Sequence, residues 1–367
     1  MSKLDGFIRP EVEPLVPYAP GLRASEVRQR AGREHVIKLS SNEFPTGPIP
    51  SAIAAMERVL PLLNNYPDGS ARALRRALAE RLGFPEEMVV LGNGSNELIR
   101  LIGQAVLRPG DEVVFAWPSF VVYPMVAQMF GATAVRVPLS EGHTHDLGAM
   151  LSAVTDKTRL VFLCNPNNPT GTIYHRAEFE EFLDGVPDHV VVVADEAYFE
   201  FVNDPEYPDA LNYVSADRAL IALRTFSKIY SLAGLRIGYG VAPAQLALGI
   251  HKVREPFNVN TVAQVAAYYS LQDEAEVRRR RDMNQEQKTY LYSCFDRIGM
   301  SYAPSEANFV YLMTERPVEV FQALLEEGVI ARDFGNAPAL RLTVPSPEDT
   351  PSVIAAFEAV AAKLGSL

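Results

Sequence analysis

Seven short apolar segments between about residues 88 and 241 constrain the fold of this chain more than any other feature. Each is rich in Val, Ile, Leu or Phe, and helical stretches separate them. Strands with such continuous apolar character are buried on both faces, as in a parallel sheet covered by helices on both sides. We therefore predict an α/β fold, a doubly wound and mostly parallel sheet, formed by MVVLG, EVVFA, ATAVRV, RLVFLC, HVVVVAD, ALIAL and RIGYGV.

A change of pattern after Pro256 indicates a second, smaller domain. A long charged helix is expected over about 273–297, followed by the strand NFVYLM, a helix over 318–327, the strand ALRLTV and a last helix ending near Leu364. The first 44 residues are proline-rich and irregular. A chain of 367 residues has room for a large and a small domain. We predict an N-terminal arm and part of the small domain at 1–44, a large domain at 45–255, and a small α+β domain at 256–367.

Charge and composition exclude several classes of protein. The formal charge of −11 argues against a nucleic-acid binder. The run Arg278 to Arg281 is best explained as a solvated or interface face of a helix. No segment approaches the roughly 20 apolar residues that cross a bilayer. Cys164 and Cys294 do not resemble a disulfide framework, and His143 and His145 have no companion ligands at metal-site spacing. We expect a soluble cytoplasmic protein without a bound metal.

A lysine and an aspartate follow two of the predicted strands. Lys228 lies in a Ser/Thr-rich turn after ALIAL, and Asp195 ends the strand VVVAD. A lysine can hold an aldehyde cofactor as a Schiff base, while a buried acid keeps a pyridine nitrogen protonated so that the ring withdraws electrons. An aspartate here could also be a helix cap. Since an unpaired buried carboxylate is costly, we expect a cationic partner for Asp195. Together the two side chains predict pyridoxal phosphate chemistry.

Polar groups near these strand ends suit a phosphate. The hydroxyls of Thr225 and Ser227 and the guanidinium of Arg236 share one short loop with the lysine, and they fit a dianion better than a solvated basic loop. In LGNGSNELI a helix opens at Ser95, where backbone N–H groups can bind an anion. An ordinary turn with a serine cap is the alternative. A dinucleotide fingerprint is absent because position 97 is Glu97.

Two further residues are expected at the same edge of the sheet. Asn168 of FLCNPNNPTG follows a strand and would lie where α/β ligands bind, although a simple Pro-Thr-Gly turn also explains the segment. Tyr198 follows Asp195 on the same short turn.

These motifs resemble the fold type I pyridoxal-phosphate enzymes, and within them the histidinol-phosphate aminotransferase branch. The resemblance extends over nearly the whole chain, from YAPG at 18–21 through SSNEFPTGP, NNYPDGS, GNGSNELI, CNPNNPTG, VVADEAY and SKIYSLAGLRIGYG to ARDFG and LRLTV. It implies a fold type I transferase with a large seven-stranded sheet domain and a small α+β domain. It also implies a homodimer with shared active sites.

The resemblance assigns roles around the cofactor. Lys228 would form the internal aldimine, Asp195 would pair with the pyridine nitrogen, and Tyr198 and Asn168 would bond to the 3-oxygen. The remaining cofactor residues implied are Ser95, Asn96, Thr225, Ser227 and Arg236 on the phosphate, Phe120 stacked on the ring, and Tyr66 reaching the phosphate of the neighbouring subunit. Taken alone, Tyr66 would more often be a packed surface aromatic.

On the substrate side, Arg341 matches an arginine that grips a carboxylate bidentately, although an arginine in an alternating strand usually faces water. Arg332 and Tyr18 match residues that bind the phosphate end of histidinol phosphate, and Glu43 is expected near the substrate. The chain has NEFPTG where many relatives have NENPYG, so Phe44 and Thr46 differ from the pattern.

The implied reaction converts histidinol phosphate and 2-oxoglutarate into imidazole acetol phosphate and glutamate, a step of histidine biosynthesis. The partners are then a small amino donor and a 2-oxo acid. An aromatic amino acid aminotransferase and a decarboxylase of phosphorylated amino acids on the same fold are the alternatives. A ligand-sensing regulator would need a basic DNA-binding module, for which the proline-rich arm is too short. A catalytically inactive binding protein is the remaining possibility.

Overall fold

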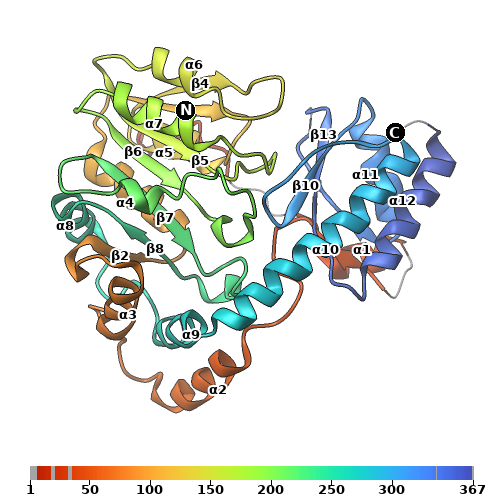
Figure 1. Cartoon of the computed structure of the whole chain (residues 1–367), viewed down its shortest axis with the longest axis horizontal. Helices are drawn as coiled ribbons and strands as arrows, with labels where there is room; N and C mark the ends of the chain where they lie inside the picture. The colour runs from red at the N-terminus through yellow and green to blue at the C-terminus, as the bar shows by residue number, and fades with distance from the viewer. Residues whose placement is uncertain (1–5, 18–20, 32–34, 336, 366–367) are drawn as a thin grey trace.

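The computed structural model describes residues 6–17, 21–31, 35–335 and 337–365. A large sheet with its helices forms one half of the molecule and a smaller sheet forms the other (Figure 1). The long helix α10 (Glu274–Ile298) runs from the large half into the small one, ending beside α11 (Pro317–Glu326) and α12 (Thr350–Leu364) (Figure 1). No helix in the described ranges is long and apolar enough to cross a membrane.

The large sheet has seven strands and is mostly parallel, as predicted. Its order is β2-β8-β7-β6-β5-β3-β4, and β8 is antiparallel to both of its neighbours. The apolar segments of the sequence form these strands, whose bounds are β2 (Val89–Gly92), β3 (Glu112–Trp117), β4 (Thr133–Pro138), β5 (Thr158–Cys164), β6 (Val191–Asp195), β7 (Leu220–Thr225) and β8 (Gly238–Val241).

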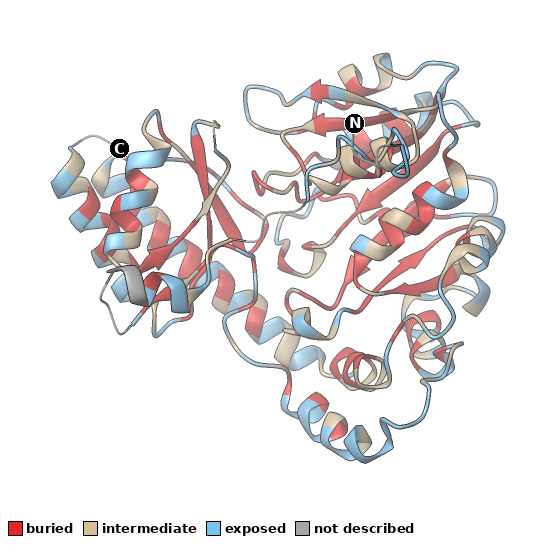
Figure 2. Cartoon of the chain, turned by 180° about the vertical axis from the view of Figure 1, so that it is seen from behind, coloured by how far each residue is buried: buried red, intermediate tan, exposed pale blue. Residues whose placement is uncertain are grey.

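Both faces of the large sheet are buried because successive side chains of a strand point to opposite sides. Along β6, Val193 packs with α4 (Ser95–Val106), α5 (Val122–Met129) and α8 (Ala244–Val253). Its neighbours Val192 and Ala194 pack with α6 (Leu147–Ser152) and α7 (Arg176–Gly185) on the other face. Figure 2 shows the strands as a continuous buried layer between these helices. Each fully buried Val or Leu contributes about 1.5–3 kcal/mol to folding.

A third group of helices covers one end of the large sheet. The helices α2 (Pro50–Val59), α3 (Arg72–Leu82) and α9 (Thr261–Leu271) share a core with residues of β2 and β8. Short 3-10 turns connect the main elements at η1 (Leu60–Leu62), η2 (Glu86–Met88), η3 (Phe199–Phe201), η4 (Ala210–Tyr213) and η5 (Ala233–Leu235).

The small half is built on a four-stranded antiparallel sheet of order β12-β13-β10-β9. Leu291 and Phe295 of α10 pack with α11 and α12 against one face of this sheet. The strands are β9 (Ser301–Ala303), β10 (Phe309–Met313), β12 (Arg332–Asp333) and β13 (Ala339–Thr343).

The N-terminal segment touches both halves. Arg9 donates a hydrogen bond to the carbonyl of Met129 in α5, at 3.1 Å. Further along, α1 (Ala24–Ala31) precedes β1 (Ile37–Lys38), which pairs in parallel with β11 (Val329–Ile330) of the small half. The division into 1–44, 45–255 and 256–367 stays a prediction. One observation bears on its second boundary, since α9 lies after residue 255 and packs with α2 and α3 of the large half.

Candidate active site

A pocket of about 290 Å³ lies at the carboxyl edge of the large sheet, facing the small half. The parallel strands β5, β6 and β7 all end there, so the residues that follow them converge. Of the residues selected from the sequence, those that line this pocket are Glu43, Ser95, Asn96, Phe120, Asn168, Asp195, Tyr198, Thr225, Ser227, Lys228, Arg236 and Arg341.

Lys228 lies in the turn after β7, and its amine faces the pocket. Nζ donates to the backbone carbonyl of Asn42 at 3.3 Å and lies 5.4 Å from the centre of the Tyr198 ring. Burial, and then the positive charge of Arg341, lowers the pKa of Lys228 to about 7. A large fraction of the amine is therefore neutral near pH 7, which is the form that attacks an aldehyde.

Asp195 is buried at the end of β6, with 3% of its surface exposed. One carboxyl oxygen, Oδ2, accepts from the Tyr123 hydroxyl at 2.8 Å, while Oδ1 is buried without a hydrogen-bond partner. Burial raises the pKa of Asp195 to about 6, although the Tyr123 hydrogen bond and the charge of Lys228 lower it. The expected cationic partner is not in hydrogen-bond contact within the described chain. The unpartnered oxygen is therefore a vacant acceptor for a positively charged donor.

Tyr198 and Asn168 lie beside this pair, as the sequence predicts. The Tyr198 oxygen accepts from Nδ2 of Asn42 at 2.9 Å. Oδ1 of Asn168 accepts from Arg341 at 2.6 Å, which links the β5 turn to β13 of the small sheet. The preceding residue, Asn167, is in hydrogen-bond contact with His145, which is buried.

Backbone geometry at the start of α4 forms a cradle for an anion. The helix begins at Ser95, and its cap position is Gly94, with φ of 76° and no side-chain cap bond. A Cβ at Gly94 would lie 2.6 Å from Nη2 of Arg236, and one at Gly238 would lie 2.5 Å from the Ser95 nitrogen. Both glycines therefore permit close approach. The serine-cap alternative is not what the structure has, and the first-turn N–H groups stay available for an anion.

The hydroxyl groups predicted for the phosphate lie together beneath this turn. Thr225 and Ser227 are hydrogen-bonded to each other at 3.0 Å, and Nη1 of Arg236 donates to Ser227 at 3.4 Å. Arg236 itself is exposed at the rim and has a left-handed φ of 60°. Two hydroxyls, a guanidinium and a helix N-terminus match the donors that a phosphate dianion accepts from.

Only some of the residues predicted to bind the substrate lie in this pocket. Arg341 is buried and donates through Nη2 to the carbonyl of Ser40 at 2.8 Å. Glu43 lines the pocket and pairs with Lys38 at 2.7 Å. Phe44, in contrast, lies in the hydrophobic core, with its ring 6.0 Å from that of Phe201.

Three predicted residues do not lie in this pocket. Arg332 lines a separate groove with Gly21, although it pairs in register with Arg341 across β12 and β13. Tyr18 lies outside the described residues. Tyr66 is 82% exposed and stacks on Phe257 with the ring centres 4.8 Å apart.

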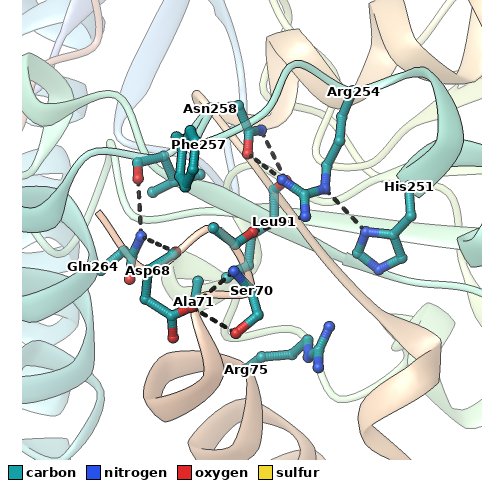
Figure 3. Close-up of a pocket in the computed structure, with 12 residues that line it drawn as sticks. Asp68, Ser70, Ala71, Arg75, Leu91, His251, Arg254, Phe257, Asn258 and Gln264 are labelled. Carbon is teal, nitrogen blue, oxygen red and sulfur yellow. Dashed lines mark hydrogen bonds between the residues drawn. The ribbon is translucent and has the colours of Figure 1, made fainter. Parts of the chain in front are cut away.

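A smaller pocket is lined by Asp68, Ser70 and Ala71 of the loop that follows Tyr66 in sequence (Figure 3). Its volume of about 10 Å³ holds about one water. Arg254 crosses it and donates to the Gly69 carbonyl at 2.8 Å and to Asn258 at 3.1 Å. Asn258 in turn donates to Glu97 at 2.8 Å, the acceptor of the Asn93 backbone N–H just before α4. This network ties the loop to the anion cradle.

Sequence patterns did not indicate three residues that organise the site. Asn42 contacts both Lys228 and Tyr198, and Tyr123 holds Asp195. Arg280, from the run expected on a solvated or interface helix face, is 2% exposed. It donates to the Ile229 carbonyl at 2.9 Å, next to the lysine. The sequence signal available for Tyr123 was its place three residues after Phe120, a predicted cofactor residue. The spacing of Glu276 and Arg280 is that of a surface ion pair on a helix and did not indicate that Arg280 is buried.

The gathered groups can carry out a defined chemistry. They offer a partly neutral amine, a buried acid with a vacant oxygen, a phenol and an anion cradle, all in one pocket. Such a set can bind a phosphorylated aromatic aldehyde, hold it covalently through the amine and keep a ring nitrogen protonated. The fold is that of the fold type I class of pyridoxal-phosphate transferases.

Comparisons with known proteins agree with this class. Residues 34–357 match the family described as aminotransferase class I and II. The chain is 46% identical over 353 residues to the histidinol-phosphate aminotransferase of Moorella thermoacetica, covering 95% of this chain and 91% of that protein. It is 46% identical over 348 residues to histidinol-phosphate aminotransferase 2 of Carboxydothermus hydrogenoformans, covering 93% and 95%. The chain belongs to the aminotransferase class I and II family.

A solved structure shows the same architecture. The crystal structure of histidinol-phosphate aminotransferase from Sinorhizobium meliloti in complex with pyridoxal-5'-phosphate has a TM-score of 0.89 and 25% sequence identity to this chain. The similarity covers 98% of this chain and 99% of that one. The fold class predicted from the apolar segments and the resemblance is confirmed, and the protein is a transaminase.

Proposed function

We propose that this transaminase uses pyridoxal phosphate and converts histidinol phosphate and 2-oxoglutarate into imidazole acetol phosphate and glutamate, as a homodimer in the cytoplasm. One observation carries the cofactor assignment. The amine of Lys228 and the unpartnered Oδ1 of Asp195 line one pocket that also contains an anion cradle. The substrate follows from the relatives named histidinol-phosphate aminotransferase, which match 93–95% of the chain.

The residues of the pocket fit this cofactor. Ser95 and Asn96 at the start of α4, with Thr225, Ser227 and Arg236, would hold its phosphate. Phe120 would lie against the ring, and Oδ1 of Asp195 would accept from the ring nitrogen. When bound, pyridoxal phosphate supplies an electron-withdrawing ring that makes the proton on the adjacent substrate carbon removable.

Proton movement is assigned to residues with suitable pKa values. Nζ of Lys228, with its pKa lowered to about 7, would accept the proton from the substrate carbon and then donate it to the neighbouring cofactor carbon. Asp195 would keep a proton on the ring nitrogen, since its buried Oδ1 has no other hydrogen-bond partner in the described chain. Tyr198 and Asn168 would orient the ring through its 3-oxygen. Arg341 binds a substrate carboxylate through its planar guanidinium.

A second arginine, Arg332, would bind the phosphate end of the substrate. Arg332 and Arg341 pair directly across two antiparallel strands, so their side chains leave the same face of the sheet. Arg332 also lies near the N-terminal arm, because a Cβ at Gly21 would be 3.6 Å from its Nη1. Two cations on one face fit donors and acceptors that carry a phosphate monoester or a second carboxylate.

Turnover of histidinol phosphate and of phenylalanine tests the substrate. We expect kcat/KM to be far higher for histidinol phosphate, and Arg332→Gln to lower it by about 10–100-fold because a charged hydrogen bond is lost. The effect should appear mainly in KM. Arg278→Gln is the matched control, since this arginine is 59% exposed and pairs with Glu274 one helical turn away.

The outcomes separate the alternatives. Faster turnover of phenylalanine would favour an aromatic amino acid aminotransferase, and release of carbon dioxide would favour a decarboxylase. An unchanged kcat/KM in Arg332→Gln would remove this arginine from the substrate site.

The homodimer is supported by an exposed apolar surface next to Tyr66. Leu60, Leu62 and Leu63 are each 51–54% exposed, and Tyr66 and Phe257 extend the same surface. Such a patch on a folded protein is typical of an interface. A second copy would cover it, and Tyr66 would then reach the anion cradle of its partner.

Mixed dimers test whether Tyr66 acts across the interface. Neither Lys228→Ala nor Tyr66→Ala dimers should be fully active, but a refolded equimolar mixture should recover about a quarter of the activity, because half of the dimers carry one intact site. A mixture of Lys228→Ala with Asp195→Asn should recover nothing, since both residues act within one chain. Equal recovery in the two mixtures, or a monomer in sedimentation, would contradict the shared site.

A further inference from the structure

Asn42 has an unusual position for a residue outside the recognised motif roles. It is 1% exposed and has a left-handed φ of 54°. Its backbone carbonyl accepts from Nζ of Lys228 at 3.3 Å and from Asn308 at 3.2 Å. Its side chain bridges Tyr198 of the large half and Thr343 of the small half. Non-glycine residues adopt such a φ rarely, so the surrounding contacts hold this conformation in place.

As the Asn42 amide is placed, the hydrogen bonds around it run in one direction. Its backbone N–H can only donate, so the Thr343 hydroxyl oxygen, at 2.9 Å, accepts. The single hydroxyl hydrogen of Thr343 is then directed to Oδ1 of Asn42 at 3.2 Å. This orients the amide so that Nδ2 faces the Tyr198 oxygen at 2.9 Å. The amide nitrogen can only donate, and the Tyr198 oxygen therefore accepts.

The consequence is a phenol whose own hydrogen points away from Asn42. Within the described chain no group accepts a hydrogen bond from the Tyr198 hydroxyl, and the residue lines the pocket. The phenol is 3% exposed, and burial raises its pKa well above the usual value, so it keeps its proton. The Tyr198 hydroxyl is thus available as a donor on the pocket side.

We propose that Asn42 is a positioning residue that sets Tyr198 as an obligate hydrogen-bond donor to the ring 3-oxygen of pyridoxal phosphate. This inference rests on the proposed function. Three hydrogen bonds set this arrangement. The backbone N–H of Asn42 donates to Thr343, the Thr343 hydroxyl donates to the Asn42 amide oxygen, and the Asn42 amide nitrogen donates to the phenol oxygen of Tyr198. A donor at the 3-oxygen stabilises negative charge there, and so favours loss of the proton on the nearby nitrogen of Lys228.

The visible absorption of the cofactor-loaded protein, followed against pH, reports this effect. Asn42→Gly removes the amide, accepts the left-handed φ and keeps the carbonyl that contacts Lys228. We expect it to raise the midpoint of the absorption change by about one pH unit, the shift that an ordinary hydrogen bond is worth. Thr343→Val should raise the midpoint by a smaller amount. Thr343→Ser keeps the hydroxyl and should have the wild-type midpoint. The other ionisable groups that face the pocket are unchanged in these variants, namely Glu43, Cys164, Asp195, Arg236 and Arg341.

A double-mutant cycle tests whether Asn42 changes the midpoint through Tyr198. If Asn42 acts through the phenol, Asn42→Gly should cause no further shift in a Tyr198→Phe background. Additive shifts, or an unchanged midpoint in the Asn42→Gly protein, would overturn the inference. Should that variant fail to fold, an unchanged midpoint in Thr343→Val overturns it equally. A wild-type protein that gains no visible band with pyridoxal phosphate would reject the proposed function, and this inference with it.

Discussion

A Lys228→Ala protein is expected to fold and bind pyridoxal phosphate in the anion cradle while losing transamination by about 10³-fold or more. The loss is large because one amine both attaches the cofactor and moves the substrate proton. Its neighbours Thr225, Ser227 and Arg236 stay in place, since their hydrogen bonds do not involve Nζ. Single-turnover kinetics and the mass of the protein after borohydride reduction measure the two effects.

Lys252→Ala is the matched control, because this lysine lies in the last turn of α8, away from the pocket. It should keep wild-type activity and a covalent adduct after reduction. If the Lys228→Ala protein still turned over and still formed the adduct, another amine would hold the cofactor. Lys288, buried on α10 with its pKa lowered to about 8, would then be the next lysine to replace.

Asp195→Asn should lower transamination by about 10²-fold or more, because the amide cannot balance a proton on the ring nitrogen in a water-poor pocket. The change is nearly isosteric, and the remaining oxygen can still accept from Tyr123. The substitution therefore tests the charge of the side chain more than its shape. Rates of each half-reaction with a saturating amino donor measure the effect.

The same variant should be more stable than the wild type in the cofactor-free state above pH 6. Burial raises the pKa of Asp195 from 3.8 to about 6, so the folded protein must ionise a carboxyl that the unfolded chain ionises more easily. Ionisation of Asp195 does not lower the free energy of unfolding of the wild type below pH 4. It lowers it progressively between pH 4 and pH 6, and above pH 6 by about 3 kcal/mol. Asn lacks this cost.

Urea unfolding of both cofactor-free proteins at pH 8 and again near pH 4 measures the difference. The free energy of unfolding should be larger for Asp195→Asn than for the wild type at pH 8. The two values should be nearly equal near pH 4. Asp188→Asn, at an exposed position, is the control substitution. A lower stability of Asp195→Asn at pH 8 would mean that the buried carboxyl has a cation beside it even without cofactor.

The architecture was predictable to an unusual extent because local patterns and a topological rule agreed. Continuous apolar segments indicated strands buried on both faces, and these are the strands of the seven-stranded sheet. The carboxyl ends of parallel strands meet at one edge, so residues placed just after them had to converge. Asn168, Asp195 and Lys228 line one pocket for that reason.

Other parts of the site depend on contacts between distant segments. Asn42 and Thr343 are 301 residues apart in sequence, and Arg341 and Asn168 are 173 apart. Arg280 has the sequence context of a surface helix, yet it is buried against the loop that carries the lysine. Nothing in the local pattern distinguishes it from its exposed neighbours Arg278 and Arg279.

The amino-acid sequence by itself determined which segments become strands, and therefore which functional groups stand at the edge of the sheet, because side-chain hydrophobicity and strand direction are local properties. Only the tertiary structure decided the environment of those groups. The unpartnered oxygen of Asp195, the lowered pKa of Lys228 and the hydrogen bond that the Tyr198 oxygen accepts from Asn42 all arise from burial and from partners far along the chain. These properties depend on how far water is excluded and on which donor meets which acceptor, and both are set when the two halves pack together.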